Sequence, residues 1–211
     1  YLQEAYGTDQ DVGSDELGAK ESEAVTLTAV DLSQLPVLMD ALDVFALALS
    51  YVDPSVVSEA RTYAQSFDSV FGDDEPSPYL DLGNFAGLAA QLAGSPELDA
   101  AVSALSDAYQ AAMVAEYHGE GRPGATGFTI FFPTPDLLVA VGTEDSEVSY
   151  TAYASRFAGA SLWDDFLAYH YTNRAIDPAA AQPGLLDPVT GAGVDLDQYA
   201  APLLDGEAQA A

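Results

Sequence analysis

Apolar residues recur every three or four positions through much of the chain, and this spacing predicts a series of helices. The clearest stripe lies between residues 35 and 49 and would bury one face of a helix. Its members are Leu35, Leu38, Met39, Leu42, Phe45, Ala46 and Leu49. The expected N-terminal caps of this helix and the next three are Asp31, Asp53, Asp81 and Ser95. We therefore expect four consecutive helices before about residue 113.

Two segments break the helical period and predict strands. Residues 25–33, VTLTAVDLS, are rich in β-branched residues and indicate a buried strand. Residues 126–133, TGFTIFFP, run apolar without alternation, so we expect a strand buried on both faces at the centre of a sheet. The segment MVAEYH at 113–118 fits either a helix end or a strand. The order of elements predicts an α/β fold, dominated by helices, with central strands near 25–32 and 126–132.

Composition divides the chain into three parts. Residues 1–24 are polar and acidic and indicate an exposed segment or loop, whereas residues 176–211 are rich in Ala, Pro and Gly and indicate an extended tail or linker. Residues 25–175 then form the folded region. Its last helix carries an aromatic cluster around Trp163, which at helical spacing indicates a core, with Ser161 and Asp164 as a capping arrangement.

The charge balance excludes some partners. The chain holds 34 Asp and Glu against 5 Lys and Arg, a formal net charge of -29. Such a surface repels nucleic acid and anionic membranes, which bind clustered Lys and Arg. A soluble acidic protein and a salt-adapted one both fit, and the single lysine, Lys20, favours salt adaptation. No apolar run reaches the ~20 residues of a membrane span, so none is expected.

Few residues offer catalytic or metal chemistry. The absence of cysteine excludes disulfides, thiolate metal sites and a cysteine nucleophile within this chain. His118 and His170 lie far apart and are expected to be surface or packing residues, so no metal or cofactor is predicted. Calcium stays open, although the acidic stretch DQDVGSDE at 9–16 lacks the register of a calcium loop. The loop GEGRPGATG at 119–127 lacks the end of a phosphate-binding loop.

Four segments in order resemble the clostripain-like cysteine peptidases. They are VTLTAVDLSQLPVLMDALDVFALAL, YLDLGNFA, TGFTIFFP and YASRFAGASLWDDFLAYHY, within residues 25–171. The resemblance implies a caspase-like α/β sandwich and a His/Cys dyad that cleaves after Arg or Lys. The dyad segments of the family lie before the first of these four blocks, and nothing in this chain matches them. No catalytic residue is therefore carried over.

The resemblance makes this chain the helix-rich C-terminal structural portion of such an endopeptidase. The dyad would come from the N-terminal part of the same protein or from a separate chain. Thr26, Thr28 and Ala29 would flank the pocket for the basic side chain, although plain sheet core explains these residues equally well. The alternative is a non-catalytic extracellular module, such as an assembly subunit, that uses Trp163 and the tail for contacts, including self-assembly. Either protein is expected outside the cell or on its surface, in high salt.

Overall fold

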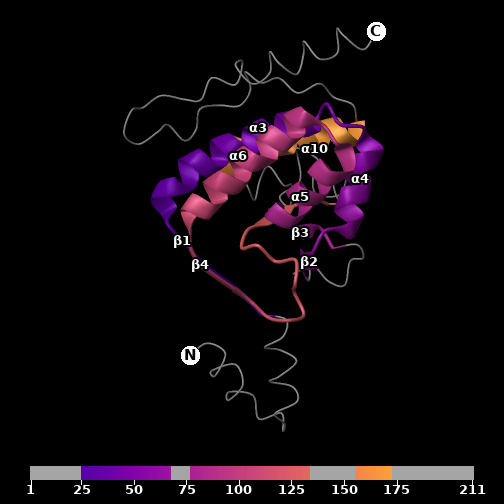
Figure 1. Cartoon of the computed structure of the whole chain (residues 1–211). Helices are drawn as coiled ribbons and strands as arrows, with labels where there is room; N and C mark the ends of the chain where they lie inside the picture. Colours follow the sequence, from indigo (N-terminus) through magenta and orange to yellow (C-terminus); the bar gives the residue numbers. More distant parts are fainter. Residues whose placement is uncertain (1–24, 68–76, 134–154, 173–211) are drawn as a thin grey trace.

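The computed structural model describes residues 25–67, 77–133 and 155–172 (Figure 1). It combines a majority of helices with small antiparallel sheets, so the general α/β class is confirmed. The predicted N-terminal segment 1–24 and tail 176–211 lie outside the described residues. In chain order the elements are β1 (Thr26–Val30), the 3-10 helix η1 (Leu32–Gln34), α3 (Leu35–Leu49), α4 (Pro54–Tyr63), β2 (Ser66–Phe67), β3 (Tyr79–Asp81), α5 (Leu82–Ala93), α6 (Pro96–Ala112), β4 (Met113–His118), β5 (Thr129–Phe131), α9 (Ser155–Ala158) and α10 (Trp163–Thr172).

Three of the four predicted helices begin at their predicted caps, Asp53, Asp81 and Ser95. The fourth prediction is wrong, because Asp31 caps the 3-10 helix η1 and α3 begins after Gln34 without a side-chain cap. Asp53 accepts a hydrogen bond from the Ser55 amide at 2.8 Å and begins α4. Ser95 accepts from the backbone amide of the third residue after it and begins α6. Gly94 ends α5 with a φ of 59°, a left-handed conformation that glycine adopts without strain. Local side-chain chemistry therefore sets these helix boundaries.

The two longest helices, α3 and α6, lie side by side, and α4, α5 and α10 gather around one end of the pair (Figure 1). An aromatic cluster fills the space between these shorter helices and α3. The rings of Phe85 and Phe132 meet edge to face with centroids 5.4 Å apart, and Phe45 packs on Phe85 in the same way at 6.0 Å. Edge-to-face contacts of this kind add to the gain from burying the rings.

Trp163 belongs to this core, as its spacing predicts. Its side chain has no exposed area, and its indole N–H donates to the carbonyl of Phe131 at 2.7 Å. The expected use of Trp163 as a contact residue in the alternative function is therefore wrong, because a partner could not reach the ring.

The two predicted strands exist, but they do not form one central sheet. β1 pairs only with β4 in the described residues, and β5 ends a separate sheet of order β2-β3-β5. Leu27 of β1 is 50% exposed, and in β5 exposed Thr129 precedes buried Ile130. Two expectations are thus wrong for the described residues: a buried strand at 25–33, and a strand at 126–133 buried on both faces at the centre of a sheet.

The physical reasons differ for the two strands. β-branched residues favour an extended backbone in β1, and this preference does not require burial. The apolar run at 126–133 instead combines the short strand β5 with Phe132, the residue that follows it. The amide of Phe132 donates to the carbonyl of Pro78 at 2.6 Å, and its ring is fully buried among the helices.

One stretch of the described residues, Leu32–Leu49, is long and apolar enough by length and composition to cross a membrane. It holds 18 residues, fewer than the ~20 taken above as the length of a membrane span. Half of the stretch is buried inside the structure, and Asp43 is among its buried residues. Packing of α3 against α6 and α10 accounts for its apolar character.

Asp81 joins the start of α5 to the loop that precedes β5. Its buried carboxylate accepts from the Asn84 amide at 2.8 Å, from the Thr126 amide at 2.6 Å and from the Thr126 hydroxyl at 2.5 Å. Gly83 packs against Thr126, and a Cβ at this position would clash with Thr126 Oγ1. The segment YLDLGNFA is therefore a packing motif in this protein.

We expect Gly83→Ala to lower the free energy of unfolding by about 1–3 kcal/mol, because the added methyl group forces Thr126 out of place. Gly87→Ala is the matched control in the same helix, where a Cβ meets nothing within 4 Å. The control should gain about 0.5–1 kcal/mol, since alanine favours a helix more than glycine does. Urea unfolding of both variants measures the difference, and equal stabilities would contradict the packing role of Gly83.

Candidate interaction site

Strands β1 and β4 form a two-stranded antiparallel ribbon that extends from the ends of α3 and α6, away from the aromatic core (Figure 1). The sequence left β4 ambiguous, and the structure resolves it as a strand. Residues directly opposite each other share a face of the ribbon. The register pairs Leu27 with Tyr117 and Ala29 with Ala115 on one face, and Thr26 with His118 and Thr28 with Glu116 on the other.

The two faces differ in their surroundings. On the inner face, the loop before β5 approaches the ribbon, because a Cβ at Gly127 would lie 3.3 Å from Thr28. Glu116 and His118 are hydrogen-bonded on this face, with Oε1 and Nδ1 2.7 Å apart. The outer face, defined by Leu27, Ala29, Ala115 and Tyr117, is apolar and exposed.

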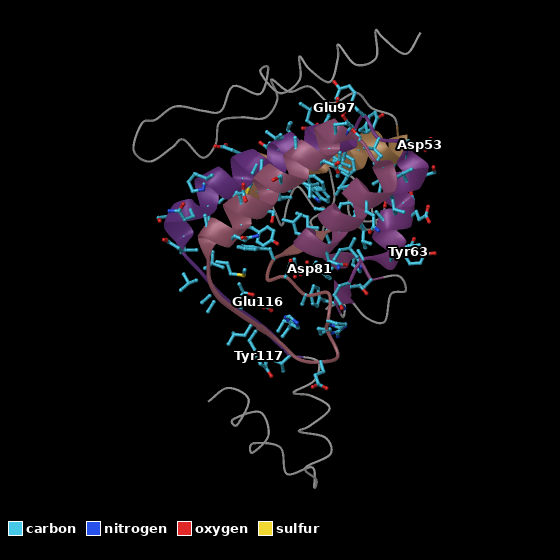
Figure 2. All side chains as sticks on the ribbon, in the orientation of Figure 1. Asp53, Tyr63, Asp81, Glu97, Glu116 and Tyr117 are labelled. Carbon is cyan, nitrogen blue, oxygen red and sulfur yellow. The ribbon has the colours of Figure 1, made fainter. Side chains whose placement is uncertain are left out.

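Figure 2 shows the position of this ribbon relative to the rest of the molecule. Glu116 and Tyr117 lie on the ribbon, whereas Asp81 lies among the core elements and Asp53 lies at the far end of the helices. The ribbon is thus a separate surface, distinct from the aromatic core.

The three residues predicted to flank a substrate pocket lie on β1 but not on one face. Thr26 and Thr28 share the inner face, whereas Ala29 lies on the outer face. Thr26 and Ala29 are exposed, and Thr28 is half-buried. Their role in a pocket stays a prediction.

Among the described residues, His170 comes nearest to forming a nucleophile and base pair, with Ser58. Its Nε2 lies 3.4 Å from the Ser58 hydroxyl, beyond the reach of about 2.6–3.2 Å that such a pair needs. Its ring stacks on Phe166 with centroids 5.8 Å apart and meets Tyr171 edge to face. Burial, and then the nearby Arg61, lower the pKa of His170. We assign it to packing.

Arg61 is a buried residue that the sequence did not single out. Its Nε and Nη2 donate to the carbonyl of Phe132 at 3.0 and 2.9 Å, and Nη2 also donates to the carbonyl of Ser77 at 3.3 Å. The Tyr171 hydroxyl donates to the carbonyl of Pro133, and burial raises the pKa of Tyr171 to about 12. These bonds fix α4 and α10 to the end of β5. The rarity of cations in the chain was the one signal that could have pointed to Arg61.

Asp43 connects α3 to the beginning of α10. Its Oδ1 accepts from the Leu162 amide at 2.7 Å, and the Ser161 hydroxyl is hydrogen-bonded to the same carboxylate. Burial raises the pKa of Asp43 to about 6, and the charges of Asp40 and Asp164 act in the same direction. The side chain is only 6% exposed, so this carboxylate titrates inside the structure.

The predicted cap of the last helix is confirmed for one of its two residues. Ser161 accepts from the amide of Trp163 at 3.1 Å. The amide of Leu162 is bound by Asp43, a residue 119 positions earlier in the sequence. The cap of α10 is therefore partly a tertiary contact, which local sequence spacing cannot reveal.

Within residues 25–67, 77–133 and 155–172, no group of three or more His, Asp or Glu side chains is placed to hold a metal ion. The acidic stretch 9–16, on which calcium stayed open, lies outside these residues. Comparison of the chain with protein-family models, with curated proteins and with solved structures finds no match in any of the three. The ribbon is therefore taken as the candidate site, because its outer face is apolar and exposed.

We expect the stability of the protein to fall as the pH rises through the titration of Asp43. The folded-state pKa of about 6 exceeds the ordinary value of 3.8, so the folded protein binds this proton more tightly than the unfolded chain. The stabilisation is complete below about pH 4 and is lost by about pH 7, with a magnitude on the order of 3 kcal/mol.

Asp43→Asn removes this dependence, because the amide keeps an oxygen acceptor and cannot ionise. The comparison is urea unfolding of wild type and variant across this pH range. Asp53→Asn is the control of opposite sign, since hydrogen bonds from Ser55 lower the pKa of Asp53. If wild type and Asp43→Asn lose stability in parallel, Asp43 does not titrate as described.

Proposed function

We propose that the chain is the C-terminal structural portion of a clostripain-like cysteine endopeptidase directed at Arg and Lys. The thiolate and its histidine would belong to the N-terminal part of the same protein or to a separate chain. The proposal rests on the four ordered sequence segments and on one structural observation, the exposed ribbon. The first of those segments begins with β1.

The ribbon supports the proposal because of what surrounds β1. In an α/β sandwich the central strands have neighbours on both edges and helices over both faces. In the described residues β1 has one neighbouring strand, and the outer face of the ribbon exposes Leu27 and Tyr117. This is the expected state of a sheet strand whose remaining neighbours belong to another part of the enzyme.

In this proposal the chain contributes structure and electrostatic attraction, not bond cleavage. Thr26, Thr28 and Ala29 would flank the pocket that receives the basic side chain. The net charge of -29 favours cationic peptides in direct contact with the surface, because high salt screens attraction at longer range. The absence of cysteine requires that the nucleophile come from elsewhere.

The second candidate is a non-catalytic extracellular binding module that uses the same ribbon to join an assembly. The lack of cysteine favours it as well, because a module of this kind needs no nucleophile. The outer face of the ribbon, and not Trp163, would make its contacts.

The natural protein that contains this chain should hydrolyse an Arg-containing peptide and lose that activity on thiol alkylation. The same peptide with Ala in place of Arg is the matched control and should be cleaved far more slowly. Residues 1–211 alone should be inactive on both peptides. A native polypeptide that begins at Tyr1 and has no partner chain would sink the peptidase proposal and leave the binding module.

We also propose that the protein works in high salt, outside the cell or on its surface. Its carboxylates repel one another, and the screening length falls from about 30 Å at 0.01 M salt to about 3 Å at 1 M. The melting temperature should therefore rise from dilute buffer to molar KCl, by roughly 4–8 °C for a gain of about 2 kcal/mol. Sucrose as a neutral cosolute controls for effects other than screening, and equal stability in dilute buffer and in molar salt would refute salt adaptation.

A further inference from the structure

We infer that the two ends of α10 respond to pH in opposite senses, so that neutral pH favours release of the end next to Asp43 and acid favours release of the end next to His170. The device belongs to the chain itself and stands whether or not the chain is part of a peptidase. It differs from a change in overall stability, because pH selects which part of one helix opens.

The N-terminal end of α10 is attached to α3 through a buried carboxylate. Oδ1 of Asp43 accepts from the Leu162 amide at 2.7 Å, and the Ser161 hydroxyl is hydrogen-bonded to the same carboxylate. Among the described residues, the charges that act on Asp43 come from Asp40 on α3 and from Asp164 on α10, and both are acidic. Loss of the proton from Asp43 therefore places a third negative charge in a cluster that spans the two helices.

Release of this end returns Asp43 to water and separates its carboxylate from Asp164. The pKa of Asp43 then falls from about 6 towards its ordinary 3.8, so the open state binds the proton more weakly than the docked state. The population of the open state consequently rises by about 50-fold between pH 4 and pH 7. Trp163 has no exposed area and leaves the core in this step, so the open state is a minor one at either pH.

The C-terminal end of α10 is attached by different contacts, to the residues that follow β5. The ring of His170 stacks on Phe166 and meets Phe132 edge to face, with the centroids of the second pair 5.4 Å apart. The Tyr171 hydroxyl donates to the carbonyl of Pro133. This end is therefore held by aromatic packing around a titratable ring.

Protonation of His170 favours release of this end. Among the described residues, the charge that acts on the ring is that of Arg61 on α4, and the Ser58 hydroxyl of the same helix lies 3.4 Å from Nε2. Burial, and then Arg61, lower the pKa of His170 below its ordinary 6.5. The docked state binds this proton more weakly than the open state, so the open state gains population as the pH falls below 6.5.

The two openings uncover different parts of the core. Release of the N-terminal end withdraws Trp163 from Phe85 and frees the carbonyl of Phe131. Release of the C-terminal end instead uncovers the ring of Phe132 beside Arg61. The pH of the surroundings thus selects which of two aromatic surfaces becomes accessible.

The test is native-state amide exchange of residues 1–211 between pH 4 and pH 7 at fixed ionic strength, corrected for the intrinsic exchange rate at each pH. The Phe166 amide donates to the carbonyl of Leu162 at 2.8 Å and reports on the N-terminal end of α10. The Tyr171 amide lies in the last turn and reports on the C-terminal end. We expect the opening constant at Phe166 to rise about 50-fold from pH 4 to pH 7, and that at Tyr171 to fall.

Two variants serve as controls for each other. Asp43→Asn keeps an oxygen acceptor for the Leu162 amide and cannot ionise, whereas His170→Phe keeps an aromatic ring and cannot be protonated. Each should abolish the pH dependence at its own end of α10 and leave that of the other end unchanged. The near-ultraviolet circular dichroism of buried Trp163 verifies folding, and the two wild-type profiles alone decide the inference if a variant does not fold.

Opposite slopes at the two amides, each removed by its own variant, support the inference. Equal opening constants at every pH mean that α10 opens as one unit or only with the whole fold, and parallel slopes mean that one group governs both ends. Either result overturns the inference, as does a slope at Phe166 that survives Asp43→Asn. Thiol-dependent hydrolysis of the Arg peptide tests the proposed function separately, and neither result changes the other.

Discussion

The described structure depends above all on Phe132, the residue that follows β5. Its ring meets Phe85, Trp163 and Phe166, so it contacts helices from both the middle and the end of the chain. Its amide is bound by the segment before β3, and its carbonyl accepts two hydrogen bonds from Arg61 of α4. One residue thus combines apolar packing with satisfied backbone groups, and burial of the ring is possible because these polar atoms have partners.

The composition imposes a second constraint, because the chain has 34 acidic residues and few cations to neutralise them. Two of the buried carboxylates are stabilised by backbone amides at helix beginnings. Asp81 binds the Asn84 amide in α5, and Asp43 binds the Leu162 amide just before α10. The positive end of a helix favours a negative group there, so this fold can bury acids without a matching number of Lys or Arg residues. Asp43 is buried deeply enough that its pKa nevertheless rises.

Sequence reasoning predicts what is local and misses what is tertiary. The boundaries of α4, α5 and α6 follow from caps at Asp53, Asp81 and Ser95, which act within three residues. The apolar run before Pro133 indicated a central strand, because composition cannot tell a residue buried within a strand from one that turns into the core just after it. Phe132, which accepts from Arg61, lies 71 positions away, and Leu162, which donates to Asp43, lies 119 positions away, so no local pattern specifies these contacts.

The contacts that stabilise the ribbon reach only part of it, so its outer face stays exposed. A two-stranded hairpin alone is marginal in water. Here α3 and α6 lie at one end of its two strands, and the loop at Gly127 approaches Thr28 on the inner face. These supports leave the outer face and the edge of β1 without comparable contacts in the described residues. Apolar area and backbone groups that are still exposed are where a further layer adds the most free energy. The ribbon thus combines exposed apolar side chains with a strand edge that no other described strand covers.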